Sequence, residues 1–241
     1  MQNSRSWTAE LILASGSPRR KEIFARLFGA DGFVVADNPF DESAVSATGS
    51  HEDYVARVSE EKCRAFLREH PGLDGFVVTA DTLVVCGRAR LGKPVDAADA
   101  AKMLRTLSGR RHRVLTAVSM ALIRSGRIRT EVESTDVWFA RLDERLIDWY
   151  ISTGEPLDKA GAYGIQELGA VLVSRIRGCY QNVVGLPIRR MMDMMEHFEQ
   201  DPGSHFMISN HLPWKQEKTM GGPDGRPEEK DQGHPQDPTP V

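Results

Sequence analysis

Cysteine is scarce in this sequence, and nothing in the spacing of its cysteines suggests pairing. There are three of them, Cys63, Cys86 and Cys179, an odd number that includes no CxxC motif. This usage argues against a disulfide-stapled domain and against a structural zinc site. It favours a reducing compartment, and we therefore expect a cytoplasmic protein.

Long apolar runs are also missing. No stretch approaches the roughly 20 apolar residues that a membrane-spanning helix needs. The first ten residues, MQNSRSWTAE, lack the apolar segment of a signal peptide. We expect no membrane partner.

The chain has no excess of basic charge. Its 31 Lys and Arg residues face 34 Asp and Glu residues, which gives a net charge of −3. No global positive field is available to attract nucleic acid, so we expect no nucleic-acid partner.

Several familiar catalytic and nucleotide-binding motifs are absent. The sequence contains no GxxxxGK[ST] motif, so it is not a P-loop nucleotidase. No GxGxxG follows a predicted strand, which leaves a dinucleotide-binding fold unsupported. Neither a GxSxG nor an HExxH motif is present.

Length and composition suit a globular α/β domain followed by a tail. Of 241 residues, 40% are apolar, enough for a core. We assign residues 1–200 to one domain. Residues 201–241 hold seven of the 13 prolines and five of the 21 glycines, and we expect this acidic Pro/Gly-rich tail to be disordered.

Hydrophobic periodicity predicts the elements of the domain. Strands are expected near residues 11–14, 33–36, 75–85, 114–123, 128–140 and 170–176. Helices are expected near residues 18–28, 51–70, 96–107, 143–151 and 188–198. The last helix is rich in methionine, which we interpret as core filler rather than as metal ligands.

The most informative stretch is LILASGSPRR at residues 11–20. A short apolar strand is followed by a small hydroxyl-rich loop, and Ser17-Pro18 is a strong helix-start signal. Arg19 and Arg20 then fall in the first turn, where the helix dipole disfavours cations. An anion such as phosphate at this helix start would explain them. The alternative is an ordinary strand–helix joint with two solvated arginines.

A second stretch, GFVVTADTLVV at residues 75–85, places Asp81 inside a strongly apolar run. A carboxylate there is costly unless it is paired or lies at a strand end facing a cleft. Carboxylates at strand ends of α/β sheets are often catalytic or metal-binding. The alternative is that Asp81 caps a local turn, but the apolar flanks favour the functional interpretation.

Three further segments carry polar residues whose role the pattern leaves open. Lys93 follows a glycine in a turn at residues 91–94, and residues 110–113 (RRHR) form a small basic cluster that we expect at a turn. The glycine-rich segment 158–169 presents Gln166, whose amide can read a base edge. It is equally a connector whose glycines serve turn geometry.

Four of these segments occur in a characteristic order. They are SGSPRR at residues 15–20, ADT at 80–82, GKP at 92–94 and KAGAYGIQ at 159–166. Each is weak by itself, but the ordered set closely resembles the Maf family of nucleoside triphosphate pyrophosphatases, over residues 11–195.

This resemblance implies an α/β fold with a mixed central sheet flanked by helices and two lobes around a cleft, as in ITPase-like proteins. It also implies a homodimer that hydrolyses a nucleoside triphosphate to the monophosphate and pyrophosphate with a divalent cation, Mg²⁺ or Mn²⁺. The role is a house-cleaning one, which removes unwanted nucleotides.

The resemblance also assigns roles to residues. Asp81 matches the catalytic proton acceptor, and Glu42 resembles a loop acid that holds the metal together with Asp81. Lys62, which on its helix reads as a solvated lysine, matches a phosphate-facing residue. The residues matched to substrate binding are Ser15, Ser17, Arg19, Arg20, Lys62, Thr82, Lys93 and Gln166.

Three positions resemble those that set base choice within the family. Arg19, Thr82 and Gln166 look like the branch that acts on dTTP and UTP, or on modified pyrimidine nucleotides. The branch that acts on 7-methyl-GTP tends to carry Trp in place of Arg19. One departure is Glu167, where glycine is common in the family.

A hypothesis from a different class of function is that the protein is a nucleotide-binding regulator of cell division or septum formation, with little catalysis. The family is linked to septum formation, and the acidic tail could serve a partner. The intact set of Asp81, Lys93 and Glu42 discriminates the two hypotheses, because a pure binder need not keep it.

Overall fold

One sheet organises the part of the chain that the computed structural model describes, residues 10–38 and 40–200. The strand order is β2-β1-β3-β5-β6-β7, with β4 also paired to β3. The bounds of the strands are β1 Glu10–Ala14, β2 Val34–Ala36, β3 Gly75–Cys86, β4 Ala89–Leu91, β5 Arg111–Leu122, β6 Arg127–Phe139 and β7 Val173–Arg177. The predicted tail, residues 201–241, lies outside the described residues.

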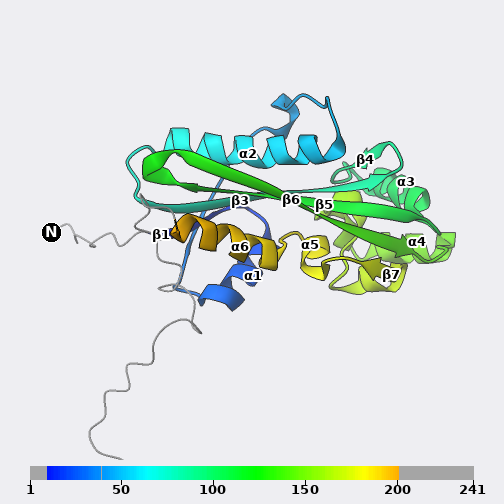
Figure 1. Cartoon of the computed structure of the whole chain (residues 1–241). Helices are drawn as coiled ribbons and strands as arrows, with labels where there is room; N and C mark the ends of the chain where they lie inside the picture. The colour runs from blue at the N-terminus through cyan, green and yellow to red at the C-terminus, as the bar shows by residue number, and fades with distance from the viewer. Residues whose placement is uncertain (1–9, 39, 201–241) are drawn as a thin grey trace, which may run out of the picture.

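Helices cover both faces of this sheet. Helix α2 lies on one face, and α1, α5 and α6 lie on the other (Figure 1). The α-helices are α1 Pro18–Phe28, α2 His51–Glu69, α3 Ala97–Leu107, α4 Glu144–Ser152, α5 Tyr180–Val184 and α6 Ile188–Glu199. The 3₁₀ turns are η1 Glu42–Ala44, η2 Ile123–Ser125, η3 Glu155–Asp158, η4 Ala160–Ala162 and η5 Leu168–Leu172.

The sheet is mixed, as predicted. Strand β1 pairs in parallel with both β2 and β3, whereas β3, β5, β6 and β7 pair antiparallel in succession. The α/β fold with a mixed central sheet flanked by helices is therefore confirmed.

One edge of β3 is left open, and this opening positions the site. Strand β1 pairs with β3 only as far as Leu13 and Val78. Strand β4 joins the same edge of β3 further along, from Val84. Between these points residues 79–83 pair with β5 on one side, and no strand of the described residues covers the other.

Local sequence signals fix where the helices begin. The Ser17 hydroxyl accepts a hydrogen bond from the Arg20 amide at the start of α1, with Pro18 in the first turn. Ser50 and Asp53 form a reciprocal capping box at the start of α2. Asp96 and Asp143 begin α3 and α4, and each side chain accepts a hydrogen bond from the amide three residues further on. The helix starts predicted at Ser17, Asp96 and Asp143 are confirmed, whereas the capping role of Ser50 was not predicted.

The predicted methionine packing is confirmed too. Four methionines of α6 are buried against the sheet in a core cluster with residues of β1, β3 and β5. They are Met191, Met192, Met194 and Met195.

The predicted strand over residues 75–85 is confirmed, and Asp81 lies in its interior, where its backbone pairs with Ala117 of β5. Of the two arrangements that would make a carboxylate tolerable there, pairing applies, because Asp81 forms an ion pair with Lys62 of α2.

The position expected for the basic cluster at residues 110–113 was only partly right. Arg110 follows the turn after α3, and the other three residues begin strand β5 instead of forming a turn. His112 is buried, whereas Arg110 and Arg111 are exposed and Arg113 is partly accessible.

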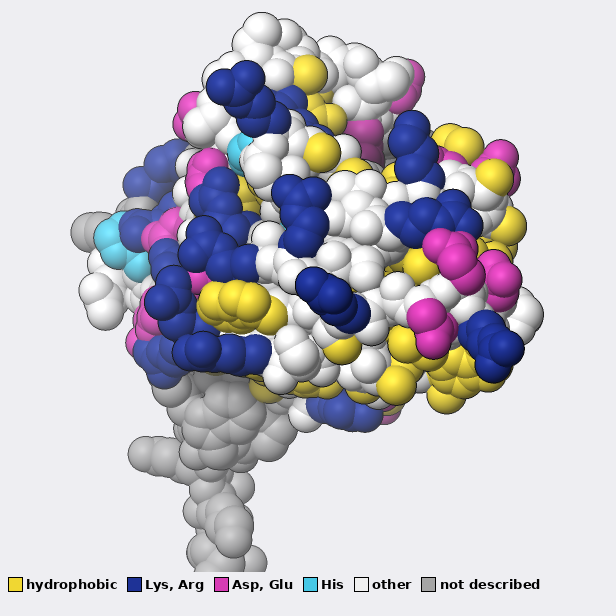
Figure 2. All heavy atoms as spheres, turned by 90° about the vertical axis from the view of Figure 1, so that its right-hand side faces the viewer, with side chains coloured by type: hydrophobic (Ala, Val, Ile, Leu, Met, Phe, Trp, Pro, Cys, Tyr) yellow, Lys and Arg dark blue, Asp and Glu magenta, His cyan; other side chains and the backbone are white. Residues whose placement is uncertain are grey.

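The accessible arginines of β5 lie beside further arginines on neighbouring strands. Arg111 is aligned with Trp138 of β6, and Trp138 with Arg175 of β7, whose guanidinium stacks on the indole. Figure 2 views this end of the molecule, where Lys and Arg side chains are widely spread. The sequence cluster is thus part of a cross-strand surface.

Smaller differences concern short elements. The segment 170–176 was expected to be a strand throughout, but β7 begins only at Val173, because residues 168–172 form the turn η5. The short elements β4 and α5 were not predicted, since three and five residues carry too little periodicity. No described helix is both long enough and apolar enough to cross a membrane.

The buried histidine predicts a pH-dependent stability. His112 is 2% exposed, and its Nε2 lies 2.9 Å from the Tyr163 hydroxyl. Burial lowers the pKa of His112 from 6.5 to about 4. The unfolded chain therefore takes up a proton first as the pH falls, and we expect unfolding to become easier by roughly 3 kcal/mol between pH 7 and pH 4.

Urea denaturation across this pH range measures the effect. In a His112→Phe variant, which has no titratable group at this position, this contribution to the pH dependence is lost. Equal losses of stability in the variant and the unmodified protein would show that the histidine does not carry the effect.

Candidate active site

A cavity of about 780 Å³ opens at the uncovered edge of β3. Its size is within the range of small-molecule sites. All ten residues singled out from the sequence line it, although they come from segments far apart in the chain. They are Ser15, Ser17, Arg19, Arg20, Glu42, Lys62, Asp81, Thr82, Lys93 and Gln166.

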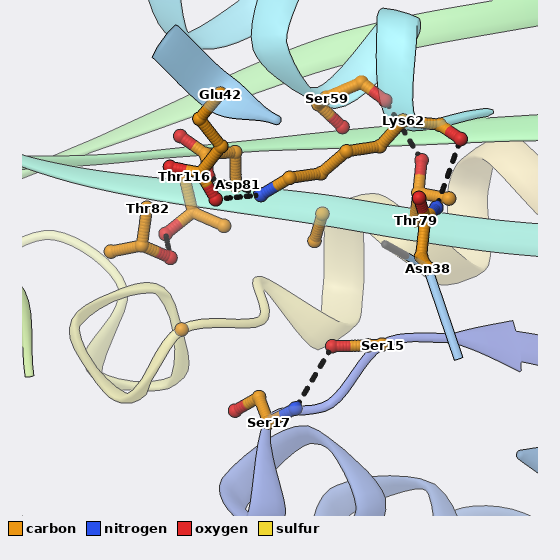
Figure 3. Close-up of polar contacts among 12 residues, drawn as sticks. Ser15, Ser17, Asn38, Glu42, Ser59, Lys62, Thr79, Asp81, Thr82 and Thr116 are labelled. Atoms are coloured by element: carbon orange, nitrogen blue, oxygen red, sulfur yellow. Dashed lines mark hydrogen bonds and ion pairs between the residues drawn. The ribbon is translucent and has the colours of Figure 1, made fainter. Parts of the chain in front are cut away.

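The loop after β1 forms one wall of the cavity. Ser15 is buried, and its hydroxyl accepts a hydrogen bond from the Ser17 amide at 3.3 Å (Figure 3). The Ser17 hydroxyl in turn caps α1. Gly16 between them is exposed, and a Cβ there would meet nothing within 4 Å. The loop therefore presents the start of α1 to the cavity with little steric cover.

Asp81 and Lys62 form the central ion pair of the site. Lys62 Nζ lies 2.8 Å from Asp81 Oδ1 and 2.6 Å from Glu42 Oε1 (Figure 3). The Asp81 and Lys62 side chains are 12% and 13% exposed. Burial raises the pKa of Asp81 above its usual 3.8, while Lys62 opposes the shift. A carboxylate with a raised pKa beside a cavity is suited to proton transfer.

Arg20 lies under the floor of the cavity and is largely committed to protein acceptors. Its Nε donates to Gly185 O at 2.8 Å, its Nη1 to Ala80 O at 2.9 Å and its Nη2 to Thr82 Oγ1 at 3.0 Å. Burial lowers the pKa of the Arg20 guanidinium. This arginine joins α1, β3 and the residue that follows α5.

Thr82 is held from behind by a chain of buried polar groups. Its hydroxyl lies 3.0 Å from Thr116 Oγ1 of β5, and Thr116 donates to the backbone carbonyl of Asn182. The Asn182 side-chain amide donates to Val114 O and to Thr135 Oγ1. Asp81 faces α2 and Thr82 faces α1 and α5, so neighbouring residues of one strand serve opposite faces of the sheet.

Three other side chains of the cavity, Arg19, Lys93 and Gln166, lie nearer the solvent. Arg19 forms an ion pair with Asp158 of η3, with 3.0 Å between Nη1 and Oδ2. Lys93 is exposed and forms no hydrogen bond or ion pair with the described residues. Gln166 is exposed on the loop between η4 and η5. Lys93 is thus available to bind an anion, and Arg19 becomes available when it exchanges its bond to Asp158 for one to the anion.

The donor set for a metal ion is small. No group of three or more His, Cys, Asp or Glu side chains in the described chain could hold a metal by itself. Glu42 and Asp81 are two carboxylates that already share one cation, the Lys62 ammonium. Two carboxylates fit a Mg²⁺-like ion that takes its other ligands from water and from phosphate oxygens.

Sequence reasoning missed several residues of the site. Asn38 donates to the Lys62 carbonyl at 2.9 Å, and Asp158 contacts Arg19. Lys159 is 7% exposed and bonds Asp158. Tyr163 lines the cavity from its buried position. Asp158, Lys159 and Tyr163 stood in the glycine-rich segment 158–169, but the contacts of Asn38 and Asp158 are with residues 24 and 139 positions away in the sequence.

Comparison with known proteins gives consistent results. A family model described as "Maf-like protein" matches residues 10–198. A dTTP/UTP pyrophosphatase of Symbiobacterium thermophilum is 48% identical over 189 residues, covering 78% of this chain and 94% of the relative. The enzyme of the same name from Anaeromyxobacter dehalogenans is 50% identical over 181 residues, covering 74% and 88%. That from Vibrio parahaemolyticus is 46% identical over 188 residues, covering 78% and 96%.

Among solved structures, a HAM1 protein from Coxiella burnetii aligns with 79% of this chain and 100% of its own, at a TM-score of 0.45 and 12% identity. The family assignment depends on the sequence matches, which cover most of the described chain and include every residue of the cavity described above. This chain is a member of the Maf family.

Proposed function

We propose that this protein hydrolyses dTTP and UTP, or modified pyrimidine nucleotides, to the monophosphate and pyrophosphate. One observation carries the proposal: a buried carboxylate, Asp81, lines the same cavity as the cations Lys62, Arg19 and Lys93, and it forms an ion pair with Lys62. Relatives at 46–50% identity are named dTTP/UTP pyrophosphatases, which supports the same activity here.

Asp81 is proposed as the proton acceptor for the attacking water. One of its oxygens, Oδ1, is held by Lys62, so the other can accept a proton from water. The water oxygen would form a bond to the α-phosphorus, and the bond from that phosphorus to the bridging oxygen would break. Pyrophosphate then leaves with the electron pair of the broken bond.

The cations around the cavity are proposed to bind the phosphates. Lys93 and Arg19 are the more accessible ones, and Lys62 lies between the carboxylates. Ser15 and Ser17 add hydroxyl and backbone donors at the start of α1, where the helix dipole favours an anion. Positive groups at the cavity stabilise the charge that develops on the leaving pyrophosphate.

A divalent cation, Mg²⁺ or Mn²⁺, is proposed to bind at Glu42 and Asp81 together with phosphate oxygens. When bound, it would supply further neutralisation of phosphate charge. The chain itself provides the two carboxylates, and Lys62 holds them in place beforehand.

Arg20 is proposed to act by positioning rather than by direct phosphate binding. Three of its nitrogens donate to the protein, one of them to the carbonyl that directly precedes Asp81. Arg19, Thr82 and Gln166 are proposed to set the preference for the base. Because the Thr82 hydroxyl is hydrogen-bonded to Arg20 and Thr116, Thr82 would affect the preference for the base by shaping the site.

Residues 1–200 are proposed as the catalytic domain, which the match over residues 10–198 supports. A homodimer in the cytoplasm is proposed because the family resemblance and the cysteine usage imply it. The regulator hypothesis is not favoured, because the relatives are named as enzymes and Asp81, Lys93 and Glu42 line one cavity.

A nucleotide panel tests the activity. We expect dTTP and UTP, with Mg²⁺ or Mn²⁺, to give the monophosphate and pyrophosphate in equal amounts, faster than CTP, GTP or 7-methyl-GTP. Chromatography of the nucleotides and separate assays for pyrophosphate and orthophosphate measure this. Orthophosphate without pyrophosphate would exclude the mechanism, and preference for 7-methyl-GTP would exclude the subclass. Retained nucleotide binding with no product under any metal would favour the regulator.

The substitution Asp81→Asn tests the proton acceptor. The amide has the same shape but cannot take the proton, so we expect kcat to fall by a factor of about 10²–10⁴. Circular dichroism should show the fold unchanged. Asp41→Asn is the matched control, because Asp41 is exposed next to Glu42 and does not line the cavity. Near-normal turnover by the Asp81 variant would make this carboxylate structural.

The substitutions Arg20→Lys and Arg19→Gln separate positioning from binding. A lysine keeps the charge of Arg20 but cannot reach its three acceptors together, so we expect unfolding to become easier by roughly 2–4 kcal/mol. Arg19→Gln should raise KM and leave stability nearly unchanged, since Arg19 pairs only with the half-exposed Asp158. Urea denaturation and steady-state kinetics measure both effects. If the Arg20 variant is as stable as the unmodified protein, the positioning role is excluded.

A further inference from the structure

The loop that carries Gln166 has few packing contacts of its own at its tip. Gln166, Glu167 and Leu168 are all exposed, and between η4 and η5 the chain has no regular backbone hydrogen bonding. Ile165 anchors the loop in the core at one point. A side chain that reads a base must nevertheless be held in place, because an amide offers directional donors and acceptors. The fixing of this loop therefore has to come from outside it.

Two side chains that precede the loop supply this fixing. The Tyr150 hydroxyl, at the end of α4, accepts a hydrogen bond from the Gly164 amide at 3.0 Å and donates to Glu155 Oε1 at 2.8 Å. The Glu155 carboxylate also accepts from the Leu168 amide at 3.0 Å and the Gly169 amide at 3.2 Å. The pair thus holds the backbone on both sides of Gln166.

The glycines at the two ends of the loop are required by the same arrangement. A Cβ at Gly169 would lie 2.5 Å from the Tyr150 hydroxyl and 2.4 Å from the Gly164 carbonyl oxygen. A Cβ at Gly164 would lie 2.5 Å from Lys159 Cε. Lys159 itself donates to the Glu155 carbonyl at 2.8 Å. The loop ends therefore pack directly on the pair and its neighbour, without intervening side chains.

Tyr150 is suited to this task because it cannot move. Its side chain is fully buried in the core cluster formed with α3 and β6, so its hydroxyl is a fixed point behind the loop. Glu155 is half-buried at the start of η3, directly after α4. A rigid helix end is thereby connected to an exposed loop tip through one hydroxyl and one carboxylate.

We propose that Tyr150 and Glu155 are positioning residues for base recognition, acting as a clamp that fixes Gln166 relative to the cavity. The proposal rests on the function proposed above, because Gln166 is taken to contact the base. Neither clamp residue is among those that line the cavity. The clamp therefore governs how tightly and how selectively a nucleotide binds, and not the rate of the chemical step at Asp81.

The substitutions Tyr150→Phe and Glu155→Gln test the clamp. Phenylalanine keeps the buried ring and removes the hydroxyl. Glutamine keeps the shape of Glu155 but brings an NH₂ donor against an N–H or O–H that needs an acceptor. For each variant we expect KM for UTP to rise about tenfold with kcat changed less than twofold, together with a smaller preference for UTP over CTP.

Inorganic tripolyphosphate distinguishes binding of the phosphates from binding of the base. It offers the phosphates without a base, so its inhibition constant should be unchanged in both variants. Matched controls are Tyr180→Phe, whose side chain is exposed on α5 and does not line the cavity, and Glu144→Gln, whose carboxylate bonds Arg105 on the surface. Both controls should keep the UTP preference of the unmodified protein.

A double-mutant cycle with Gln166→Ala makes the test specific. If Tyr150 acts through Gln166, adding Tyr150→Phe to Gln166→Ala should change KM by less than twofold. Additive effects of the two substitutions would overturn the proposal, as would a loss confined to kcat. A raised inhibition constant for tripolyphosphate would also overturn it, because the damage would then reach the phosphate end.

Hydrogen exchange in the nucleotide-free protein distinguishes failure of the clamp from failure of the proposed function. Exchange of the Gly164, Leu168 and Gly169 amides should accelerate in both clamp variants and not in the controls. Unchanged exchange would overturn the clamp whatever the substrate proves to be. If the unmodified protein hydrolyses no nucleotide, the proposed function fails, and the role in base recognition fails with it even where exchange shows that the pair orders the loop.

Discussion

The ion pair between Asp81 and Lys62 is the interaction on which the site depends. A carboxylate in the middle of a buried strand would be strongly destabilising without a partner, and removing one member of such a pair typically costs about 3–5 kcal/mol. Here Lys62 reaches Asp81 from the covering helix α2, at 2.8 Å, and extends to Glu42 as well. The ion pair keeps the Asp81 carboxylate at the cavity, where it stays accessible to a substrate.

The open edge of β3 explains why that acid can face a cavity at all. A strand with partners along both edges exposes side chains only through its faces, which helices cover here (Figure 1). Because β1 stops early and β4 starts late, residues 79–83 are reachable from the side. Asp81 and Thr82 then point to opposite faces yet line the same cavity. Arg20 closes the floor by binding carbonyls on β3 and after α5.

The cations of the site fall into two physical groups. Arg20 and Lys62 are held by protein acceptors, and these contacts fix their geometry in the absence of a ligand. Arg19 and Lys93 lie nearer the solvent and have fewer protein bonds, so an anion can recruit them at small cost. Neighbours in the sequence, such as Arg19 and Arg20, therefore differ in their protein contacts, and that difference follows from burial rather than from residue type.

Sequence alone predicted the order of the longer elements, the helix starts at Ser17, Asp96 and Asp143, and ten of the residues that line the cavity. Caps and hydrophobic periods act over a few residues, and the ordered motifs carried the family resemblance. The tertiary structure alone decided that Lys62 pairs with Asp81, that His112 is buried in β5, and that Tyr150 and Glu155 hold the Gln166 loop. Such contacts depend on strand pairing and on packing between distant segments, for which a single sequence contains no local signal.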